Sequence, residues 1–531
     1  MKHIKKLFQW LDRHLLELLS GFLLVLIPLY PKWPLADVLP GYIVRLRLDD
    51  VLVLLVYIVW GIQLVRKKVN LRENPLTGPI LIYLGIGLLS SLSALFVTHT
   101  VPLQRIHVAK LFLHWGRRIE YMSLAFVFFS AFRTPRQLRR LVSLLGLVVI
   151  ASTIYGLGQK YLQWPVYSTM NREFAKGWRL VLTEHARVPS TFAGHYDFAA
   201  FNVLALALLS ALMFYAGKGK VSKRVIIVFV AAFVSLLLTA SRTSFIAYLV
   251  AVSVVIVLLS VRSGWKWGTG RWVVIMALSL AGMLSFGDLS QRYAHFFRIT
   301  ELKEYITYEI LKKSPPDLSS AGMTGDLALV YTETDQPPIP FTPDMNGQLP
   351  PDVYENIPLA FPQSTIAGEA EASSLAGKPR TYSPAAFTFG LSSAIRFDAL
   401  WPRAVEGFLA NPLLGSGYST LVKTQTTEFT EAESTDNDYL RALGETGVLG
   451  FLSFYGILGY ALAMIWKNKD RIKNQFLFAV SAGIGGAIVG LLVNGAYIDI
   501  FEASKVAYPF WAMMGVLFAI FKMSEPMKEE K

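Results

Sequence analysis

The chain of 531 residues contains no cysteine, and charged residues make up only 17% of it. Without cysteine it has no disulfide framework and no thiolate metal site, although this absence does not identify the compartment. The low charge, with 53% hydrophobic residues and a mean hydropathy of +0.43, excludes an ordinary soluble globular composition. Walker, Rossmann, HExxH and nucleophile-elbow patterns are also absent, so soluble nucleotide chemistry has no visible site.

Apolar segments long enough to cross a membrane recur along most of the chain. A bilayer core of about 30 Å requires about 20 apolar residues, and in lipid each such segment must be helical. We therefore expect an all-α polytopic membrane protein with about twelve transmembrane helices. The expected spans are 15–31, 47–65, 76–97, 111–132, 138–159, 190–215, 224–240, 243–260, 272–286, 447–466, 475–497 and 504–521. The fourth is the weakest prediction, because Arg117, Arg118 and Glu120 lie near its start. They could pair with each other or mark an amphipathic lead-in at the interface, and the two arginines could face a lipid phosphate on the outer side.

The basic residues, which give a net charge of +14, cluster in short segments between the apolar spans. This is the positive-inside pattern of membrane proteins, and it argues against nucleic-acid binding. The pattern predicts that both termini are cytoplasmic. Lys2, Lys5 and Lys6 precede the first apolar segment as in a signal peptide, but no small-residue cleavage site follows. We therefore interpret this segment as a retained first helix.

One long polar segment, 287–446, separates the ninth and tenth expected spans. It follows an odd number of spans and contains roughly twice as many acidic as basic residues, so we predict that it is extracytoplasmic. The chain then divides into helices 1–9 (1–286), this loop, and helices 10–12 with a cytoplasmic tail (447–531). Within the loop, the Pro-rich residues 314–384 predict irregular structure, either a solvated lid or spacer or a segment that grips substrate. Residues 392–446 have a helical pattern.

Three arginines are expected at the outer face of the membrane. Arg187 precedes the sixth span, Arg242 lies at the turn between the seventh and eighth spans, and Arg396 lies in the long loop. They could extend to lipid headgroups or form structural ion pairs. Alternatively, they converge on one polyanion, because guanidinium groups match phosphate oxygens in geometry and charge.

Two further residues are candidates for a chemical role. Asp436 opens the run Asp436-Asn437-Asp438 before a helix, which is the pattern of an N-cap, but its carboxylate could also act as a general base. His195 lies at the outer end of the sixth span and suits a hydrogen-bonded structural histidine better than a metal ligand. Since no second histidine lies at ligand spacing, we predict no metal site, and we expect no cofactor.

Four short motifs follow one another along the chain. Arg187 is followed by Ser190-Thr191-Phe192 and Ala199, and Ser241-Arg242 precedes an apolar span. Arg396, Trp401 and Ala404 lead to Asn411-Pro412-Leu413-Leu414-Gly415-Ser416-Gly417, and Asn437-Asp438-Tyr439-Leu440 leads to Glu445-Thr446-Gly447 and Gly450. In this order they resemble the motifs of the O-antigen ligase and O-antigen polymerase superfamily of bacterial membrane glycosyltransferases. The resemblance covers roughly residues 180–520.

The resemblance implies metal-independent, inverting transfer of a glycan from a polyprenyl diphosphate carrier to an acceptor hydroxyl on a glycan or glycolipid. It places the protein in a bacterial cytoplasmic membrane, as in lipopolysaccharide biosynthesis, with the reaction on the outer side. It implies that Arg187, Arg242 and Arg396 hold the diphosphate. Where the family has a histidine base, this chain has Asp436, and an aspartate is ordinarily the weaker base. His195 is the alternative source of an imidazole.

Two other functions remain open from the sequence. One is a transporter for a small anion such as bicarbonate. Gly483, Gly485, Gly486 and Gly490 in the eleventh span could form its broken helix, although they equally suit close helix packing. The other is a non-catalytic scaffold of a polysaccharide-export complex, which the missing histidine favours. No heptad pattern indicates an oligomeric state.

Overall fold

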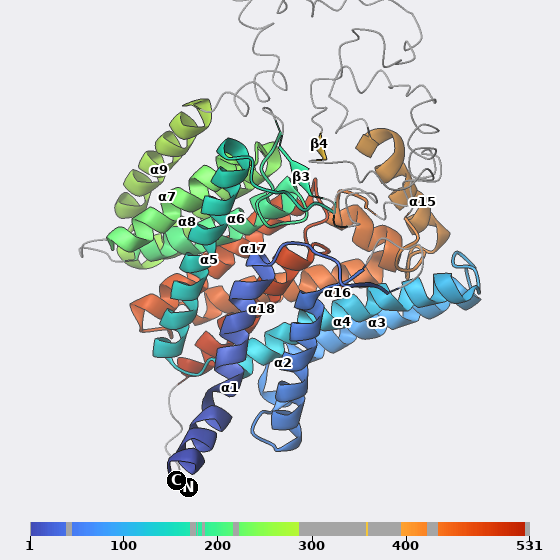
Figure 1. The fold of residues 1–531 in the computed structure, drawn as a ribbon, viewed down its shortest axis with the longest axis horizontal. Helices are drawn as coiled ribbons and strands as arrows, with labels where there is room; N and C mark the ends of the chain where they lie inside the picture. The colour runs from blue at the N-terminus through green and yellow to red at the C-terminus, as the bar shows by residue number, and fades with distance from the viewer. Residues whose placement is uncertain are drawn as a thin grey trace, which may run out of the picture. The chain divides into compact units, whose positions relative to one another are not determined.

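The computed structural model describes residues 2–38, 45–169, 177, 179–182, 186–215, 222–285, 357–358, 395–421 and 434–525 (Figure 1). Met1–Ala281, Tyr354–Ala360 and Arg396–Lys531 form one compact unit. Most of the expected loop at 287–446, including its Pro-rich part at 314–384, lies outside the described residues. The domain boundaries drawn around this loop therefore stay predictions.

Helices account for most of the described chain. They are α1 (Lys2–Leu29), α2 (Leu48–Val65), α3 (Thr77–Phe96), α4 (Arg105–Ala131), α5 (Pro135–Tyr161), α6 (His195–Phe214), α7 (Lys223–Leu238), α8 (Arg242–Ser263), α9 (Trp265–Ser285), α15 (Trp401–Ala410), α16 (Asp438–Asn468), α17 (Gln475–Gly495) and α18 (Ser504–Met523). A short 3-10 turn occupies Leu71–Glu73, and a π-helical turn, Arg396–Leu400, precedes α15.

The strands of the described chain are two-residue antiparallel pairs. β1 (Ala36–Asp37) pairs with β2 (Arg45–Leu46), so that Ala36 lies opposite Leu46. β3 (Leu180–Val181) pairs with β4 (Ile357–Pro358), so that Leu180 lies opposite Pro358. These pairs fix local loop geometry and leave the architecture all-helical.

Nine of the described helices are long and apolar enough to cross a membrane: α2, α3, α5, α6, α8, α9, α16, α17 and α18. The other three expected spans are helices too, namely α1, α4 and α7. These three do not meet the same criterion of length and apolar composition. The apolar part of α1 is short, α7 has 16 residues, and α4 carries several charges. The multi-pass helical architecture is confirmed, and nine of the twelve spans are supported by length and composition.

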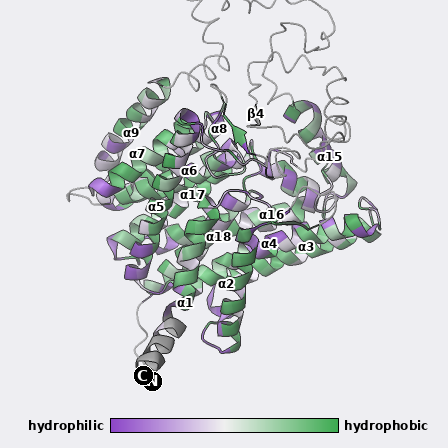
Figure 2. Ribbon diagram, in the orientation of Figure 1, coloured by the Kyte–Doolittle hydropathy of each residue, from purple (hydrophilic) through white to green (hydrophobic). Residues whose placement is uncertain are grey.

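The helices α6, α17 and α18 form the centre of the unit. Between 83% and 89% of their apolar stretches is buried inside the protein, against 17% for α2 and α9. Hydrophobic residues run along most of these helices (Figure 2). The outer helices therefore present their apolar faces to lipid, while α6 and α17 pack against other helices.

Glycines allow α17 to approach its neighbours closely. A Cβ atom added at Gly486 would lie 2.7 Å from the carbonyl oxygen of Ala251 on α8. One at Gly483 would lie 2.8 Å from the Cα of Leu208 on α6. These contacts are the close packing that small residues permit between membrane helices.

The loops predicted to be cytoplasmic are joined to one another. Arg133 donates to the carbonyl oxygen of Lys68 at 3.2 Å, and Lys522 pairs with Glu73. Arg262 likewise donates to the carbonyl oxygen of Ile472 at 2.9 Å. Because α8 and α17 run between these loops and the opposite end of the unit, Arg242 and the residues after Gly495 lie at that other end. The arrangement groups the loops as predicted, and the orientation in the membrane stays a prediction.

Candidate functional site

Arg187 lies in the segment before α6, whose first residue is His195. The amide of Val188 donates to the carbonyl oxygen of Leu238, which ties this segment to the end of α7. The Arg187 Nη1 lies 2.8 Å from His195 Nε2 and 3.1 Å from the Tyr196 hydroxyl oxygen. Arginine can only donate, so Nε2 of His195 must accept this hydrogen bond. The nitrogen that a general base would use is therefore already engaged with Arg187.

Arg396 lies in the π-helical turn before α15, and only 2% of it is exposed. Its Nη2 is 2.9 Å from Asp436 Oδ2, and its guanidinium carbon lies 4.0 Å from the centre of the Tyr497 ring. The guanidinium also hydrogen-bonds to the hydroxyl of Tyr196. Burial alone would lower the pKa of Arg396, but the Asp436 carboxylate, Tyr196 and Tyr497 together outweigh burial, and the pKa is raised. Arg396 thus stays charged although it is almost closed off from solvent.

Tyr196 connects the two arginines. Its hydroxyl receives hydrogen bonds from Arg187 and from Arg396, which come from segments far apart in the sequence. The sequence interpretation missed Tyr196 and Tyr497, although Tyr196 stands next to the predicted His195. Because two arginines from different segments share this hydroxyl, positive charge is concentrated around it.

Asp436 is not the N-cap of α16. That role belongs to Asn437, whose side chain accepts from the amides of Tyr439 and Leu440. Asp436 has φ +50°, and its Oδ1 accepts from the Ser434 hydroxyl at 2.6 Å while Oδ2 contacts Arg396. With 31% of its side chain exposed, this carboxylate can be reached from outside the unit.

Arg242 is placed near this group through its helix. It begins α8, where the Ser241 hydroxyl caps the first turn and Ser244 donates to Asn494 Oδ1 at 3.1 Å. Asn494 is in α17, three residues before Tyr497. The described contacts bring Arg187 and Arg396 together, and they place Arg242 at the same end of the unit through its backbone.

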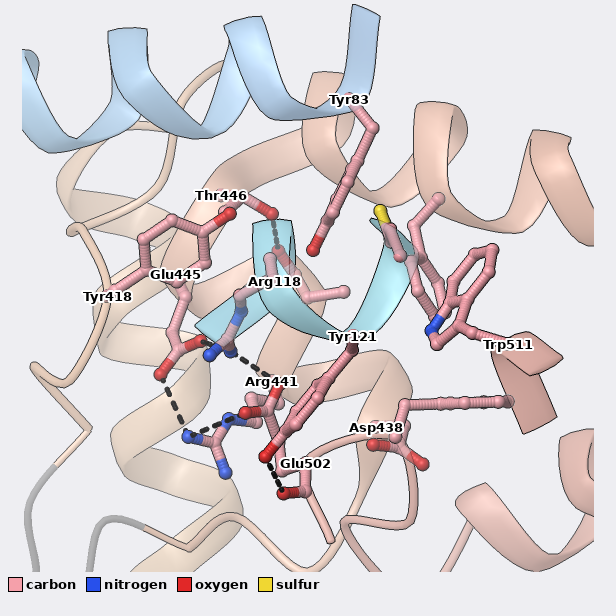
Figure 3. Close-up of a pocket in the computed structure, with 14 residues that line it drawn as sticks. Tyr83, Arg118, Tyr121, Tyr418, Asp438, Arg441, Glu445, Thr446, Glu502 and Trp511 are labelled. Carbon is pink, nitrogen blue, oxygen red and sulfur yellow. Dashed lines mark hydrogen bonds and ion pairs between the residues drawn. The ribbon is translucent and has the colours of Figure 1, made fainter. Parts of the chain in front are cut away.

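A second cluster of charges lies next to the Asp436 turn. Arg118 Nη2 is 3.2 Å from Glu445 Oε2 and also pairs with Glu502. Arg441 Nη2 is 3.3 Å from Glu445 Oε1, and its Nη1 is 2.9 Å from Asp499 Oδ2. Figure 3 shows Arg118 and Arg441 reaching Glu445 from two helices, around a cavity of about 40 Å³. A cavity of this size holds a water molecule or two.

The positions of Arg117 and Arg118 bear on one expectation. Arg117 Nη1 lies 2.7 Å from Asp50 Oδ1 and 3.2 Å from Glu120 Oε2, and Arg118 meets the carboxylates of the second cluster. The expected pairing of Arg117 with Glu120 is confirmed. The alternative, that these arginines face a lipid phosphate, gains no support from these contacts, because protein carboxylates pair with both.

Residues 227–455 match the family model of O-antigen ligase. This match confirms the resemblance to the O-antigen ligases. The matched segment begins in α7 and ends in α16, so it contains Arg242, Arg396 and Asp436. A search of curated proteins gives no match. An O-antigen ligase segment implies enzymatic glycan ligation in lipopolysaccharide biosynthesis, with lipid-linked glycans as substrates.

Proposed function

We propose that this protein transfers a glycan from a polyprenyl diphosphate carrier to an acceptor hydroxyl on the outer side of a bacterial cytoplasmic membrane. The observation that carries the proposal is the meeting of Arg187 and Arg396 on the Tyr196 hydroxyl, with the Asp436 carboxylate on Arg396. A polyanionic leaving group requires cations that are already in place, and an acceptor hydroxyl requires a base beside them.

The diphosphate would bind to Arg187 and Arg396, with Arg242 at the adjacent helix start. Guanidinium groups donate two parallel hydrogen bonds to phosphate oxygens, so a pair of arginines fixes both the charge and the orientation of the diphosphate. The first turns of α6 and α8 add the partial positive charge of helix N-termini. Negative charge grows on the diphosphate as the sugar–phosphate bond breaks, and these groups stabilise it.

Asp436 is the proposed base. The acceptor oxygen attacks the anomeric carbon from the face opposite the diphosphate, its proton passes to an Asp436 oxygen, and the C–O bond to phosphate breaks. The bonding electrons leave with the polyprenyl diphosphate, so the anomeric configuration inverts, as in inverting enzymes that use a carboxylate base. In the absence of substrate Arg396 holds Asp436 Oδ2. A bound diphosphate would compete for Arg396 and free this oxygen for the acceptor.

The alternative of an anion transporter finds no specific support. It needs a broken helix near the middle of the membrane. The glycine-rich α17 is one continuous helix from Gln475 to Gly495, and Gly483 and Gly486 pack against α6 and α8. These contacts favour the packing interpretation of the glycines. The scaffold alternative differs from the proposal by one property, turnover.

The test uses purified protein in detergent with a polyprenyl diphosphate oligosaccharide and a glycan acceptor. We expect wild type to release polyprenyl diphosphate with glycan transfer, and both Arg396→Ala and Asp436→Asn to lose at least about a hundredfold in rate. Arg403→Ala is the matched control, because Arg403 lies on α15 close to Arg396 in sequence but pairs with Glu406 at the surface. This variant should turn over like wild type.

The variants also separate the two candidate bases. His195→Gln keeps an acceptor for Arg187 and should retain most activity if Asp436 is the base. Activity that survives Asp436→Asn and disappears in His195→Gln would move the base to His195. If wild type binds no carrier lipid and transfers no glycan to any acceptor, the proposed function fails and the scaffold alternative stands.

A further inference from the structure

Asp499 lies in the connection between α17 and α18, and its carboxylate holds the turn that carries Asp436. Oδ1 accepts from the amide of Asn437 at 2.8 Å. Oδ2 accepts from the amide of Thr435 at 2.8 Å and faces the Ser434 hydroxyl at 3.2 Å. These groups stand on both sides of Asp436 in the chain. The carboxylate therefore fixes the backbone before and after Asp436 without touching Asp436 itself.

The turn needs such a support because Asp436 has φ +50°. This left-handed conformation is uncommon for residues other than glycine, and it persists where surrounding contacts determine it fully. The two amide bonds to Asp499 are charge-assisted, which makes them stronger than bonds between neutral groups. If the backbone dihedral angles at Asp436 changed, its carboxylate would point away from Arg396.

Asp499 is itself held by the second charge cluster. Only 8% of its side chain is exposed, and Arg441 Nη1 lies 2.9 Å from Oδ2. Arg441 in turn contacts Glu445, which Arg118 of α4 also pairs with. A buried carboxylate is costly unless a paired cation and hydrogen bonds compensate it, and here both are present. The sequence of contacts thus runs from α4 through α16 to the Asp436 turn.

We propose that Asp499 is a positioning residue for Asp436, held in place by Arg441 with Arg118 behind it. The inference rests on the proposed function, because it concerns the geometry of the proposed base. Asp499 acts on the orientation of that base through its contacts with the turn and with Arg441, whereas the diphosphate is proposed to bind Arg187 and Arg396. Its loss should therefore reduce turnover more than binding of the carrier lipid.

The test is a double-mutant cycle of Asp499→Asn and Asp436→Asn, measured as kcat and KM for the lipid donor. Asparagine puts an NH₂ group where one carboxylate oxygen now accepts, so the turn loses bonds at similar side-chain volume. We expect kcat to fall by about 10- to 100-fold, as for a misplaced catalytic group, with KM changed by less than about threefold. The double variant should be no slower than Asp436→Asn alone, because Asp499 has no base left to position.

Asp470→Asn is the matched control, since Asp470 is an exposed carboxylate paired with Lys469 in the α16–α17 connection. It should leave both kcat and KM at wild-type values. The proposal would be overturned if the two fold-losses in kcat multiplied in the double variant. A rise of KM with kcat unchanged in Asp499→Asn would overturn it as well. A wild type without transfer activity would instead overturn the proposed function, so the two failures are distinguishable.

Two complications have defined remedies. If Asp499→Asn does not fold, as judged by thermal unfolding and gel filtration, Ser434→Ala replaces it, because Ser434 contacts both Asp436 and Asp499. If Asp436→Asn is too slow to measure, Ser434→Ala takes its place in the cycle. Combined Ser434→Ala and Asp499→Asn effects that fall short of their product support one shared turn, whereas effects that multiply fully contradict it.

Discussion

Arg396 keeps its charge in a nearly closed site because three kinds of partner meet its guanidinium. The Asp436 carboxylate neutralises it, the Tyr196 hydroxyl accepts from it, and the face of Tyr497 lies against it. A buried guanidinium whose charge is neutralised in this way is a prepared anion site whose current occupant is a carboxylate of the same chain. At the scale of single residues, exchange of that carboxylate for a phosphate is the central step of the proposal.

Lys32 gives a prediction about stability at the same scale. It follows α1, only 5% of it is exposed, and its Nζ donates to the Ser504 hydroxyl at 2.5 Å. Burial, with the nearby Arg47 second, lowers the pKa of Lys32 from 10.5 to about 8. Between these values the unfolded chain binds the proton and the folded protein does not. The free energy of unfolding therefore gains a contribution as pH rises through this window, up to about 3 kcal/mol.

The measurement compares the melting temperature of wild type with that of Lys32→Met from pH 7.5 to 10.5. Wild type should gain stability relative to the variant as pH rises, because methionine carries no proton. Lys68→Met, at an exposed lysine between α2 and α3, should show a constant difference. A difference for Lys32→Met that stays flat across this range would show that Lys32 keeps an ordinary proton affinity.

At the scale of elements, the kink in α16 joins the site to the membrane helices. Gly447 has φ +63° and ψ −168°, which interrupts the helix at its tenth residue. The amide of Gly417 donates to the carbonyl oxygen of Glu445 at 2.9 Å, and that of Leu449 donates to Leu413. The segment after α15 thus fits into the kink. The kink separates the first part of α16, which carries Arg441 and Glu445, from the part that follows Gly447, so the two parts do not share one continuous helix axis.

Gly447→Ala should therefore destabilise the protein strongly. The added Cβ would lie 2.3 Å from the carbonyl carbon of Leu413, and the backbone conformation is essentially restricted to glycine. We expect a loss of about 3 kcal/mol or more in the free energy of unfolding, seen as a lower melting temperature in detergent.

Gly456→Ala is the matched control in the same helix. A Cβ at Gly456 meets nothing within 4 Å. This variant should keep or slightly raise stability, by up to about 1 kcal/mol, because alanine is the better helix former. Equal melting temperatures for the two variants would contradict the prediction, because they would show that the backbone at Gly447 accommodates a side chain as readily as the backbone at Gly456.

Local patterns predicted the helices and missed the contacts between them. Each of the twelve expected spans coincides with a helix, since an apolar run in lipid has one way to satisfy its backbone. The second charge cluster was not predictable, because Arg118, Glu445 and Glu502 are hundreds of residues apart or in different motifs. Asp436 was assigned two roles from sequence, and only the positions of Asn437 and Arg396 distinguish them. The catalytic and binding roles of the site residues stay predictions.

At the scale of the whole molecule, the absence of cysteine makes the predicted orientation directly measurable. Glu406→Cys on α15 and Asp470→Cys between α16 and α17 each create one thiol at a position whose side chain is 62% and 77% exposed. With both termini in the cytoplasm, a membrane-impermeant maleimide should label Glu406→Cys in intact spheroplasts. It should label Asp470→Cys only after the membrane is opened.

The reverse labelling pattern would invert the topology and place the proposed transfer on the cytoplasmic side. Wild type is the blank in both conditions, because it has no thiol to react. Labelling of both variants in intact spheroplasts would indicate that α16, the described helix between the two positions, does not cross the membrane.

The shared hydroxyl of Tyr196 has a consequence for the end of the reaction cycle. On the proposed function, the carrier arrives as a diester and leaves as a free diphosphate with an additional ionisable oxygen. Two arginines linked through one tyrosine therefore attract the spent carrier more strongly than the loaded one. Turnover would then be governed by departure of the spent carrier, and an enzyme that hydrolyses free polyprenyl diphosphate in the same membrane would accelerate glycan transfer without touching this protein.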